Sequence, residues 1–317
     1  MAHAAVGAGQ RLLIVEGMET RTAAVNGLDI AYETFGEATD PPILLVMGLG
    51  TQMIAWPDEM CEELAAAGHF VIRFDNRDVG LSTHLRGVTA PRPLATFARR
   101  QSPPYTIDDM AGDAFGLLDA LGIESAHVAG ASMGGFIAQT MALLSPQRVR
   151  SLALIMTSTG SRRVGMPSPK LFVRMMKGRA PVDGRESAIT QSLDVMRMIG
   201  SPGYPFDTAY LRDLAERSYD RAYDPGGYLR QVAAVSSQPD RTQGLRRLVV
   251  PTVVIHGLDD PLVAPSGGLA LAKAIRGSTF VGIPGMGHDL PRPLWTLYAR
   301  ELIENARRVK VPGDASR

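Results

Sequence analysis

Short apolar segments alternate with longer stretches of helical periodicity along most of this 317-residue chain. Apolar runs of strand length are typical of strands that are buried on both faces of a sheet. Such runs occupy residues 43–47, 70–74, 126–129, 149–156, 252–255 and 279–283. Amphipathic helical patterns occupy residues 57–67, 106–121, 136–144 and 294–309. Because strands that alternate with helices form right-handed βαβ units, the sequence predicts an α/β fold with a mostly parallel central sheet flanked by helices.

The start of the chain follows a different pattern. Asn26-Gly27 separates two strand-like segments, residues 20–25 and 28–35. Asn-Gly is favoured in two-residue hairpin turns because both turn residues need a positive φ. We therefore expect the chain to open with an antiparallel pair of strands.

One long segment interrupts the alternation. Residues 160–238 contain amphipathic, Met-rich and Arg-rich pieces separated by Pro and Gly, without a buried strand-like run. Their apolar content argues against a disordered loop. We predict that residues 160–238 form a helical cap over the carboxyl edge of a core made of residues 1–159 and 239–317. Flexible thioether side chains suit helix packing and, in part, the wall of an apolar pocket. The methionines of this segment are Met166, Met175, Met176, Met196 and Met198.

Charge and cysteine content exclude several classes of protein. The chain has 33 basic and 32 acidic side chains, so it offers no single-sign field for nucleic acid or an anionic membrane. The lone Cys61 excludes an internal disulfide and suits a reducing compartment. No apolar run approaches the roughly 18 residues of a membrane span, and the N-terminus lacks the pattern of a signal peptide. We expect a soluble cytoplasmic protein without an integral membrane segment, and the sequence indicates no particular oligomeric state.

A nucleophile motif lies between a predicted strand and a predicted helix. Gly130-Ala131-Ser132-Met133-Gly134 matches G-x-S-x-G and follows the strand at 126–129. A sharp strand-to-helix turn exposes the serine hydroxyl in a strained backbone conformation, and small neighbours let strand and helix approach closely. The motif and its context predict that Ser132 is a nucleophile.

A serine hydroxyl needs a neighbouring base to react at neutral pH. His288 follows the predicted strand at 279–283, at a carboxyl end, where ligands bind in open α/β sheets. We predict His288 as the general base. His256 and His84 are the alternatives, because each also follows a predicted strand.

An acid is needed to fix the histidine tautomer and to stabilise the imidazolium. Leu258-Asp259-Asp260-Pro261 follows the predicted strand at 252–255, so the chain order is Ser, Asp, His, as expected for a G-x-S-x-G hydrolase. We predict Asp260, which Pro261 restricts to an extended conformation, with Asp259 as the alternative.

Acyl transfer also needs fixed N–H donors for the developing oxyanion. Met133 follows the serine directly, and Leu49 lies in the Gly48-Leu49-Gly50 loop after the strand at 43–47. We predict their N–H groups as the two donors. The sequence has no Cys/His cluster of the kind that holds a metal, and we expect no metal and no organic cofactor.

Together these motifs resemble the α/β-hydrolase superfamily over nearly the whole chain, and most of all aclacinomycin methylesterase-like proteins and related actinobacterial lipase/esterases. The resemblance is carried by Trp56-Pro57 and by residues 44–48, 73–82, 130–135 and 283–288. It implies the α/β-hydrolase fold, a Ser132–His288–Asp260 triad and a structural role for Arg77 in holding loops together. Many relatives have His-Gly where this chain has Met47-Gly48, and the cap is the part that varies most among them.

These observations predict a serine carboxylic-ester hydrolase that forms an acyl-enzyme, acting on small-molecule esters with apolar or aromatic groups. Thioesterase, lactonase, cofactor-free perhydrolase and carbon–carbon hydrolase are alternatives, because they share the triad. A ligand-sensing protein on the same fold is the alternative outside enzymes.

Overall fold

The computed structural model describes residues 13–15, 18–91, 95, 96, 98, 100–176 and 182–309. Among these residues nine strands form one sheet in the order β1-β2-β3-β5-β4-β6-β7-β8-β9. Strands β4 to β9 run parallel to one another, as predicted. They are β4 (Pro42–Val46), β5 (Phe70–Phe74), β6 (Ala126–Ala131), β7 (Val149–Ile155), β8 (Thr252–Gly257) and β9 (Thr279–Ile283).

The antiparallel edge of the sheet begins with the hairpin expected from Asn26-Gly27. Strands β2 (Met18–Val25) and β3 (Leu28–Phe35) pair antiparallel around that turn. Asn26 and Gly27 have φ values of 52° and 78°, as a type I′ turn requires. β1 (Leu13–Val15), which the sequence analysis did not predict, pairs antiparallel with β2.

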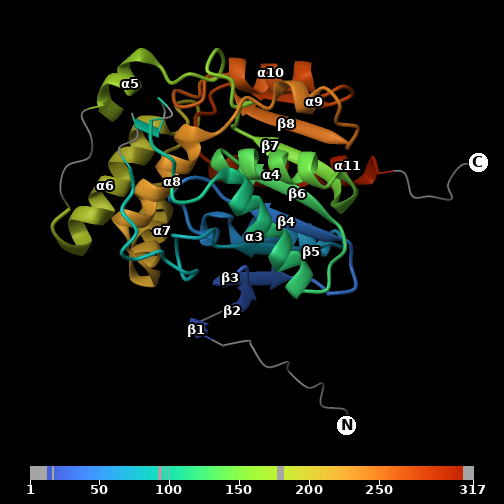
Figure 1. The fold of residues 1–317 in the computed structure, drawn as a ribbon, viewed down its shortest axis with the longest axis horizontal. Helices are drawn as coiled ribbons and strands as arrows, with labels where there is room; N and C mark the ends of the chain where they lie inside the picture. Colours follow the sequence, from blue (N-terminus) through green and yellow to red (C-terminus); the bar gives the residue numbers. More distant parts are fainter. Residues whose placement is uncertain are drawn as a thin grey trace, which may run out of the picture.

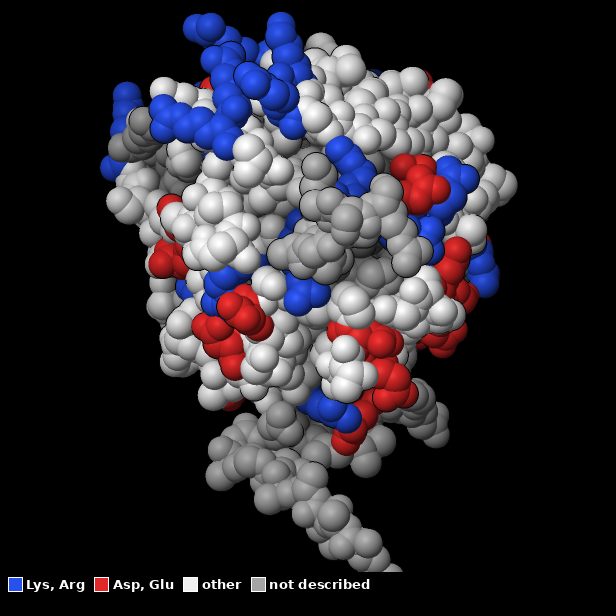
Figure 2. Space-filling model, turned by 90° about the vertical axis from the view of Figure 1, so that its right-hand side faces the viewer, with Lys and Arg blue, Asp and Glu red and all other residues white. Residues whose placement is uncertain are grey.

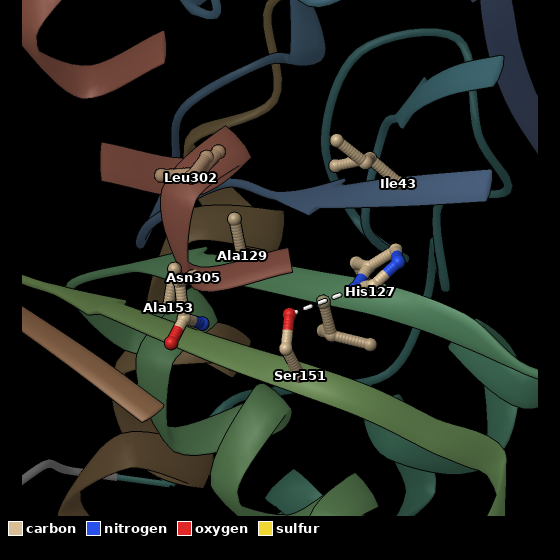
Figure 3. A pocket seen from close by; sticks show the side chains of 8 residues that line it. Ile43, His127, Ala129, Ser151, Ala153, Leu302 and Asn305 are labelled. Atoms are coloured by element: carbon tan, nitrogen blue, oxygen red, sulfur yellow. Dashed lines mark hydrogen bonds between the residues drawn. The ribbon is translucent and has the colours of Figure 1, made fainter. Parts of the chain in front are cut away.

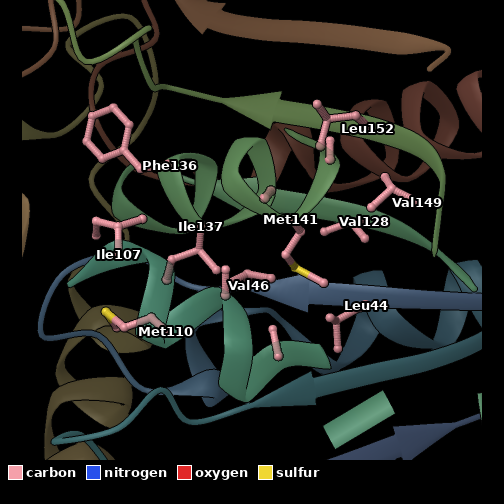
Figure 4. Packing of buried hydrophobic residues seen from close by; sticks show 14 of the residues in the cluster. Leu44, Val46, Ile107, Met110, Val128, Phe136, Ile137, Met141, Val149 and Leu152 are labelled. Atoms are coloured by element: carbon pink, nitrogen blue, oxygen red, sulfur yellow. The ribbon is translucent and has the colours of Figure 1, made fainter. Parts of the chain in front are cut away.

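Helices cover both faces of the sheet (Figure 1). One face carries α3 (Ile107–Ala120), α4 (Met133–Leu144) and α10 (Ser266–Ala274), and the other carries α1 (Asp58–Ala66) and α11 (Trp295–Arg307). Side chains of β4 alternate between these layers, because successive residues of a strand point to opposite faces. Leu44 and Val46 face α3 and α4 (Figure 4), whereas Ile43 and Leu45 belong to the cluster with α1 and α11.

The segment predicted as a cap supplies four helices between β7 and β8. They are α5 (Pro169–Met176), α6 (Gly184–Ile199), α7 (Thr208–Arg221) and α8 (Pro225–Ser237), and they group together at the left of Figure 1. The short α9 (Thr242–Leu245) then leads back to β8. The division into core and cap at residues 160 and 238 stays a prediction.

Charged side chains of both signs share the face in Figure 2, with Lys and Arg gathered at the top and Asp and Glu lower down. This mixture agrees with the net charge of +1. Among the helices that the structure describes, none is long and apolar enough to cross a bilayer. The cytoplasmic location stays a prediction.

Candidate active site

Ser132 lies at the junction of β6 and α4, where the chain turns sharply. Its backbone has φ 54° and ψ −116°, a conformation that non-glycine residues rarely adopt. The turn depends on the glycines of the motif. A Cβ on Gly130 would lie 2.2 Å from the carbonyl oxygen of Gly134, and a Cβ on Gly134 would lie 2.0 Å from that of Val46. Only glycine therefore permits this approach of strand and helix.

The predicted triad residues form a continuous hydrogen-bonded chain. His288 Nε2 lies 2.9 Å from Ser132 Oγ, and His288 Nδ1 lies 2.7 Å from Asp260 Oδ2. The second oxygen of Asp260 accepts hydrogen bonds from the N–H groups of Leu262 and Val263, each at 2.8 Å. Asp260 is 4% exposed and His288 7% exposed. The carboxylate is thus fixed by its own loop and in turn orients the imidazole.

The loop that carries His288 is fastened to the end of α6. The N–H of His288 donates to the carbonyl of Ile199 at 2.7 Å. Ser201 Oγ accepts from the N–H of Gly287 at 2.9 Å and donates to the carboxylate of Asp289. Burial raises the pKa of Asp289 above its ordinary value. The histidine is therefore positioned by a segment that the sequence places in the predicted cap.

Asp259, the alternative acid, takes a different position. Its Oδ2 accepts the N–H of Gly285 at 2.7 Å, which links the loop after β8 to the histidine loop. Of the two adjacent acids, Asp260 is the one hydrogen-bonded to His288.

His256, one alternative base, lies fully buried beside Asp260. Its Nε2 is 2.8 Å from the carbonyl of Val263 and 3.8 Å from Asp260 Oδ2. Burial lowers the pKa of His256, because it disfavours the charged ring. A Cβ on Gly268 of α10 would lie 2.5 Å from His256 Nδ1, so α10 closes tightly over the ring. His256 packs behind the triad and does not contact the serine.

His84, the second alternative base, belongs to a charged cluster at the amino-terminal end of α8. Its Nδ1 lies 2.8 Å from Asp224, and ligand atoms of Asp78, His84 and Asp224 lie within 4.8 Å of one another. Arg230 donates to both carboxylates, at 2.7 and 2.8 Å to Asp78 and 3.1 Å to Asp224. The guanidinium lies between the two carboxylates and neutralises part of their charge, so the cluster forms a buried ion-pair network.

The predicted oxyanion donors flank the serine. A Cβ on Gly48 would lie 3.2 Å from Ser132 Cβ, so the backbone of this loop passes directly beside the serine. The Gly48 carbonyl accepts the N–H of Thr51 at 3.3 Å, and within the described part of the chain the N–H of Leu49 has no acceptor. Met133 is the first residue of α4, where N–H groups have no partner within the helix. Among the described residues neither N–H group therefore has a protein acceptor, and their role as oxyanion donors stays a prediction.

The segment after β5 holds the surrounding loops, as the sequence suggested. Arg77 donates to Asp113 of α3 and lies over the ring of Tyr105, with its guanidinium carbon 5.1 Å from the ring centroid. Asn76 Nδ2 donates to the carbonyl of Met47 at 3.1 Å, at the start of the loop beside the serine.

Sequence reasoning missed the links between this segment and helices α7 and α8. Asp78 forms its buried ion pair with Arg230 of α8, and Asp75 lies 3.1 Å from Arg221 at the end of α7. The partners are about 150 residues apart in the chain, and no local pattern signals such pairs.

A second serine–histidine pair lies at the amino ends of the strands, away from the triad. Figure 3 shows Ser151 of β7 beside His127 of β6, with Oγ and Nδ1 2.8 Å apart. The adjoining cavity, which Asn305 of α11 also lines, has a volume of about 10 Å³, roughly the space of one water molecule. No substrate fits there, so the candidate site is the one at Ser132.

Comparison with known proteins gives a family match and relatives that cover nearly the whole chain. A model of the α/β-hydrolase fold family matches residues 41–291. The chain is 30% identical to rhodomycin D methylesterase DauP of Streptomyces sp. (strain C5), over 93% of this chain and 100% of the relative.

Solved structures are similar over most of the chain. An enol-lactonase from Burkholderia xenovorans LB400 superposes with a TM-score of 0.66 at 26% identity, covering 90% of this chain and 100% of that one. The esterase RhEst1 from Rhodococcus sp. ECU1013 superposes with a TM-score of 0.71 at 20% identity, covering 95% and 100%. The second likeness shows the fold alone.

Proposed function

Because this chain belongs to the α/β-hydrolase family and is an ester-hydrolysing enzyme, we propose that Ser132 is its nucleophile, His288 its general base and Asp260 the acid that orients the histidine. The observation that carries the proposal is the unbroken chain of hydrogen bonds from Ser132 through His288 to Asp260. It joins the three groups in the order that acyl transfer requires.

In the first step Ser132 Oγ attacks the ester carbonyl while His288 Nε2 takes the hydroxyl proton. The carbonyl oxygen becomes an oxyanion, which the N–H groups of Leu49 and Met133 stabilise. The tetrahedral intermediate collapses, and the leaving alcohol departs with the proton from His288. Water, deprotonated by His288, then cleaves the acyl-enzyme and regenerates Ser132.

The proposed substrate is a small-molecule ester with apolar or aromatic groups, held between the core and a cap formed by residues 160–238. Similarity to a rhodomycin D methylesterase supports a methyl ester of a larger molecule as one form of such a substrate. The cap methionines give limited support, because Met166 and Met198 are exposed and Met196 is half-buried. The side chains of Met175 and Met176 lie outside the described residues.

Hydrolysis of p-nitrophenyl esters from acetate to palmitate by wild type and by Ser132→Ala tests the proposal. We expect activity in the wild type that rises from acetate toward longer or aromatic acyl groups, and none above background in the variant. A preference for short polar esters would contradict the substrate class. Equal activity of the two proteins would contradict the nucleophile.

Lactone hydrolysis is the second candidate, because a lactone is a cyclic ester and the chain is 26% identical to an enol-lactonase of known structure. Turnover of a lactone series by the same two proteins separates this activity from that on open-chain esters. Binding of a ligand without turnover by the wild type would favour the sensing alternative. Thioester, peracid and carbon–carbon substrates would be tested only if the wild type hydrolyses neither the open-chain esters nor the lactones.

A further inference from the structure

A buried glutamine of the cap contacts the loop that carries one of the proposed oxyanion donors. Gln231 of α8 is 0% exposed. Its Oε1 accepts the N–H of Gly50 at 2.7 Å, and its Nε2 donates to the carbonyl of Arg77 at 2.8 Å. The amide thereby bridges the loop after β4 and the loop after β5. None of the motifs in the sequence points to this residue.

The contact fixes a particular peptide unit. The N–H of Gly50 and the carbonyl of Leu49 belong to one peptide plane, and Thr51 Oγ1 donates to that carbonyl at 3.2 Å. Gln231 thus holds one end of the plane and Thr51 the other. The preceding peptide, whose carbonyl is that of Gly48, is held by the N–H of Thr51. Its own N–H, that of Leu49, has no acceptor among the residues that the structure describes.

Helix α8 also packs against this loop sterically. Gly50 has φ 64°, and a Cβ there would lie 2.6 Å from the ring of Tyr228, one turn before Gln231. The neighbouring Arg230 is fixed to the core by its buried ion pair with Asp78. These contacts hold α8, and with it Gln231, against the loop after β4 even when no substrate is bound.

We propose that Gln231 is a positioning residue for catalysis: by binding the Gly50 N–H it holds the Leu49–Gly50 peptide, and so directs the Leu49 N–H toward the oxyanion formed at Ser132. This inference rests on the proposed ester hydrolysis. Glycine-containing loops can exchange peptide orientations readily, because glycine tolerates both signs of φ. Gly50 itself is exposed, so without Gln231 its N–H can turn to water, and nothing then holds this peptide plane at its N–H end.

The first test compares Gln231→Met, which keeps the length of the side chain and removes both hydrogen bonds, with the wild type. We expect kcat to fall at least ten-fold with KM changed less than three-fold, because an oxyanion donor acts in the transition state and not on the bound ester. Binding of a trifluoromethyl ketone, which forms a tetrahedral oxyanion with the serine, should weaken by the same factor as kcat/KM.

Gln139→Met is the matched control. Gln139 is also 0% exposed, lies on α4 and donates to the carbonyl of Ser158, and among the described residues it has no hydrogen bond to the loop after β4. Its replacement removes one hydrogen bond of a buried amide on the helix that follows Ser132 and should leave kcat within two-fold of the wild type. A merely structural role for Gln231 would make the two variants alike in kcat, and that result would overturn the inference.

Gln231→Glu provides a second readout. When protonated, this carboxyl group can accept from the Gly50 N–H and donate to the carbonyl of Arg77, as glutamine does; when ionised, it places a negative charge beside the loop. We therefore expect an additional ionisation in the kcat profile of this variant, with activity falling as pH rises. A profile parallel to that of the wild type would count against the proposal, and this readout stands even if Gln231→Met fails to fold.

The two proposals fail differently. Equal rates of ester hydrolysis by the wild type and by Ser132→Ala would contradict the proposed function. An active wild type with unchanged kcat and unchanged trifluoromethyl ketone binding in Gln231→Met would contradict only the role of Gln231.

Discussion

Two serine–histidine pairs lie on the same sheet at opposite ends of its strands. Ser132 and His288 meet at the carboxyl ends with 2.9 Å between Oγ and Nε2, and Ser151 and His127 meet near the amino ends with 2.8 Å between Oγ and Nδ1. Judged by that distance alone, the two pairs are equivalent. They differ in everything around the hydrogen bond.

Three differences separate the pairs. Ser132 occupies a strained turn before a helix, whereas Ser151 lies within the regular strand β7. The ring of His288 is hydrogen-bonded to the carboxylate of Asp260, whereas the ring of His127 packs edge-on against the ring of His69. Among the described residues the N–H groups of Leu49 and Met133 near Ser132 have no acceptor, whereas a cavity the size of one water molecule adjoins Ser151. We therefore expect the backbone conformation, the third group and the N–H donors to distinguish a reactive serine, more than a neighbouring histidine does.

Removing each serine gives the largest expected contrast. Ser132→Ala should lower kcat for an activated ester by about 10⁴-fold or more, because the nucleophile itself is lost. Ser151→Ala should leave kcat within two-fold and cost about 1–2 kcal/mol of stability, because it leaves the buried His127 ring without its partner. Steady-state kinetics and urea unfolding of both variants measure the two effects. A large loss of activity in Ser151→Ala would break the distinction.

Changing the acid tests the second difference. Asp260→Asn should lower kcat by about 10³–10⁴-fold with little change in KM, because the amide no longer stabilises the imidazolium or fixes its tautomer. Asp259→Asn is the control, since Asp259 binds only the N–H of Gly285 on the histidine loop, and its loss should remain below ten-fold. Equal losses in the two variants would contradict the assignment of Asp260.

The smallest expected effect concerns stability against pH. Burial, followed by the charges of His69 and Arg150, lowers the pKa of His127 from 6.5 to about 4. Between these values the unfolded chain binds more protons than the folded one, so His127 destabilises the fold progressively as pH falls from about 6.5 to 4, by up to about 3 kcal/mol.

Urea unfolding of His127→Asn and wild type at pH 7, 5.5 and 4.5 checks this expectation. Asparagine keeps a hydrogen-bonding side chain beside Ser151 and does not titrate, so the stability of the variant should fall less steeply with decreasing pH. Parallel pH dependence of the two proteins would show that His127 does not titrate differently on folding.

Local signals in the sequence predicted the parts of the fold that depend on neighbouring residues. Asn26-Gly27 indicated a turn because two successive positive φ values favour these residues, and the structure has that hairpin. The glycines around Ser132 indicated a tight strand-to-helix turn, and the structure requires them for the approach of α4 to β6. The parallel order of the main strands followed from their alternation with helices.

Features that depend on distant residues were not predictable in this way. Helix α10 begins with Ser266-Gly267-Gly268, although glycine has a low helix propensity. Glycine is needed at position 268 because the helix packs directly against the ring of His256 on β8. The bond from Gly50 to Gln231 joins residues 181 positions apart, and the ion pair of Asp78 with Arg230 joins residues 152 apart. The sequence could propose Ser132, His288 and Asp260 as a triad, but not the residues of α8 that contact the loops after β4 and β5.

The most direct test of the nucleophile assignment is the site of covalent labelling by a fluorophosphonate. Such a reagent forms a stable adduct with an activated serine, and intact mass followed by peptide mapping locates it. We predict one adduct per chain, on Ser132, and no adduct in Ser132→Ala. Labelling of Ser151 or of another residue, or an unlabelled wild type that still hydrolyses esters, would contradict the account.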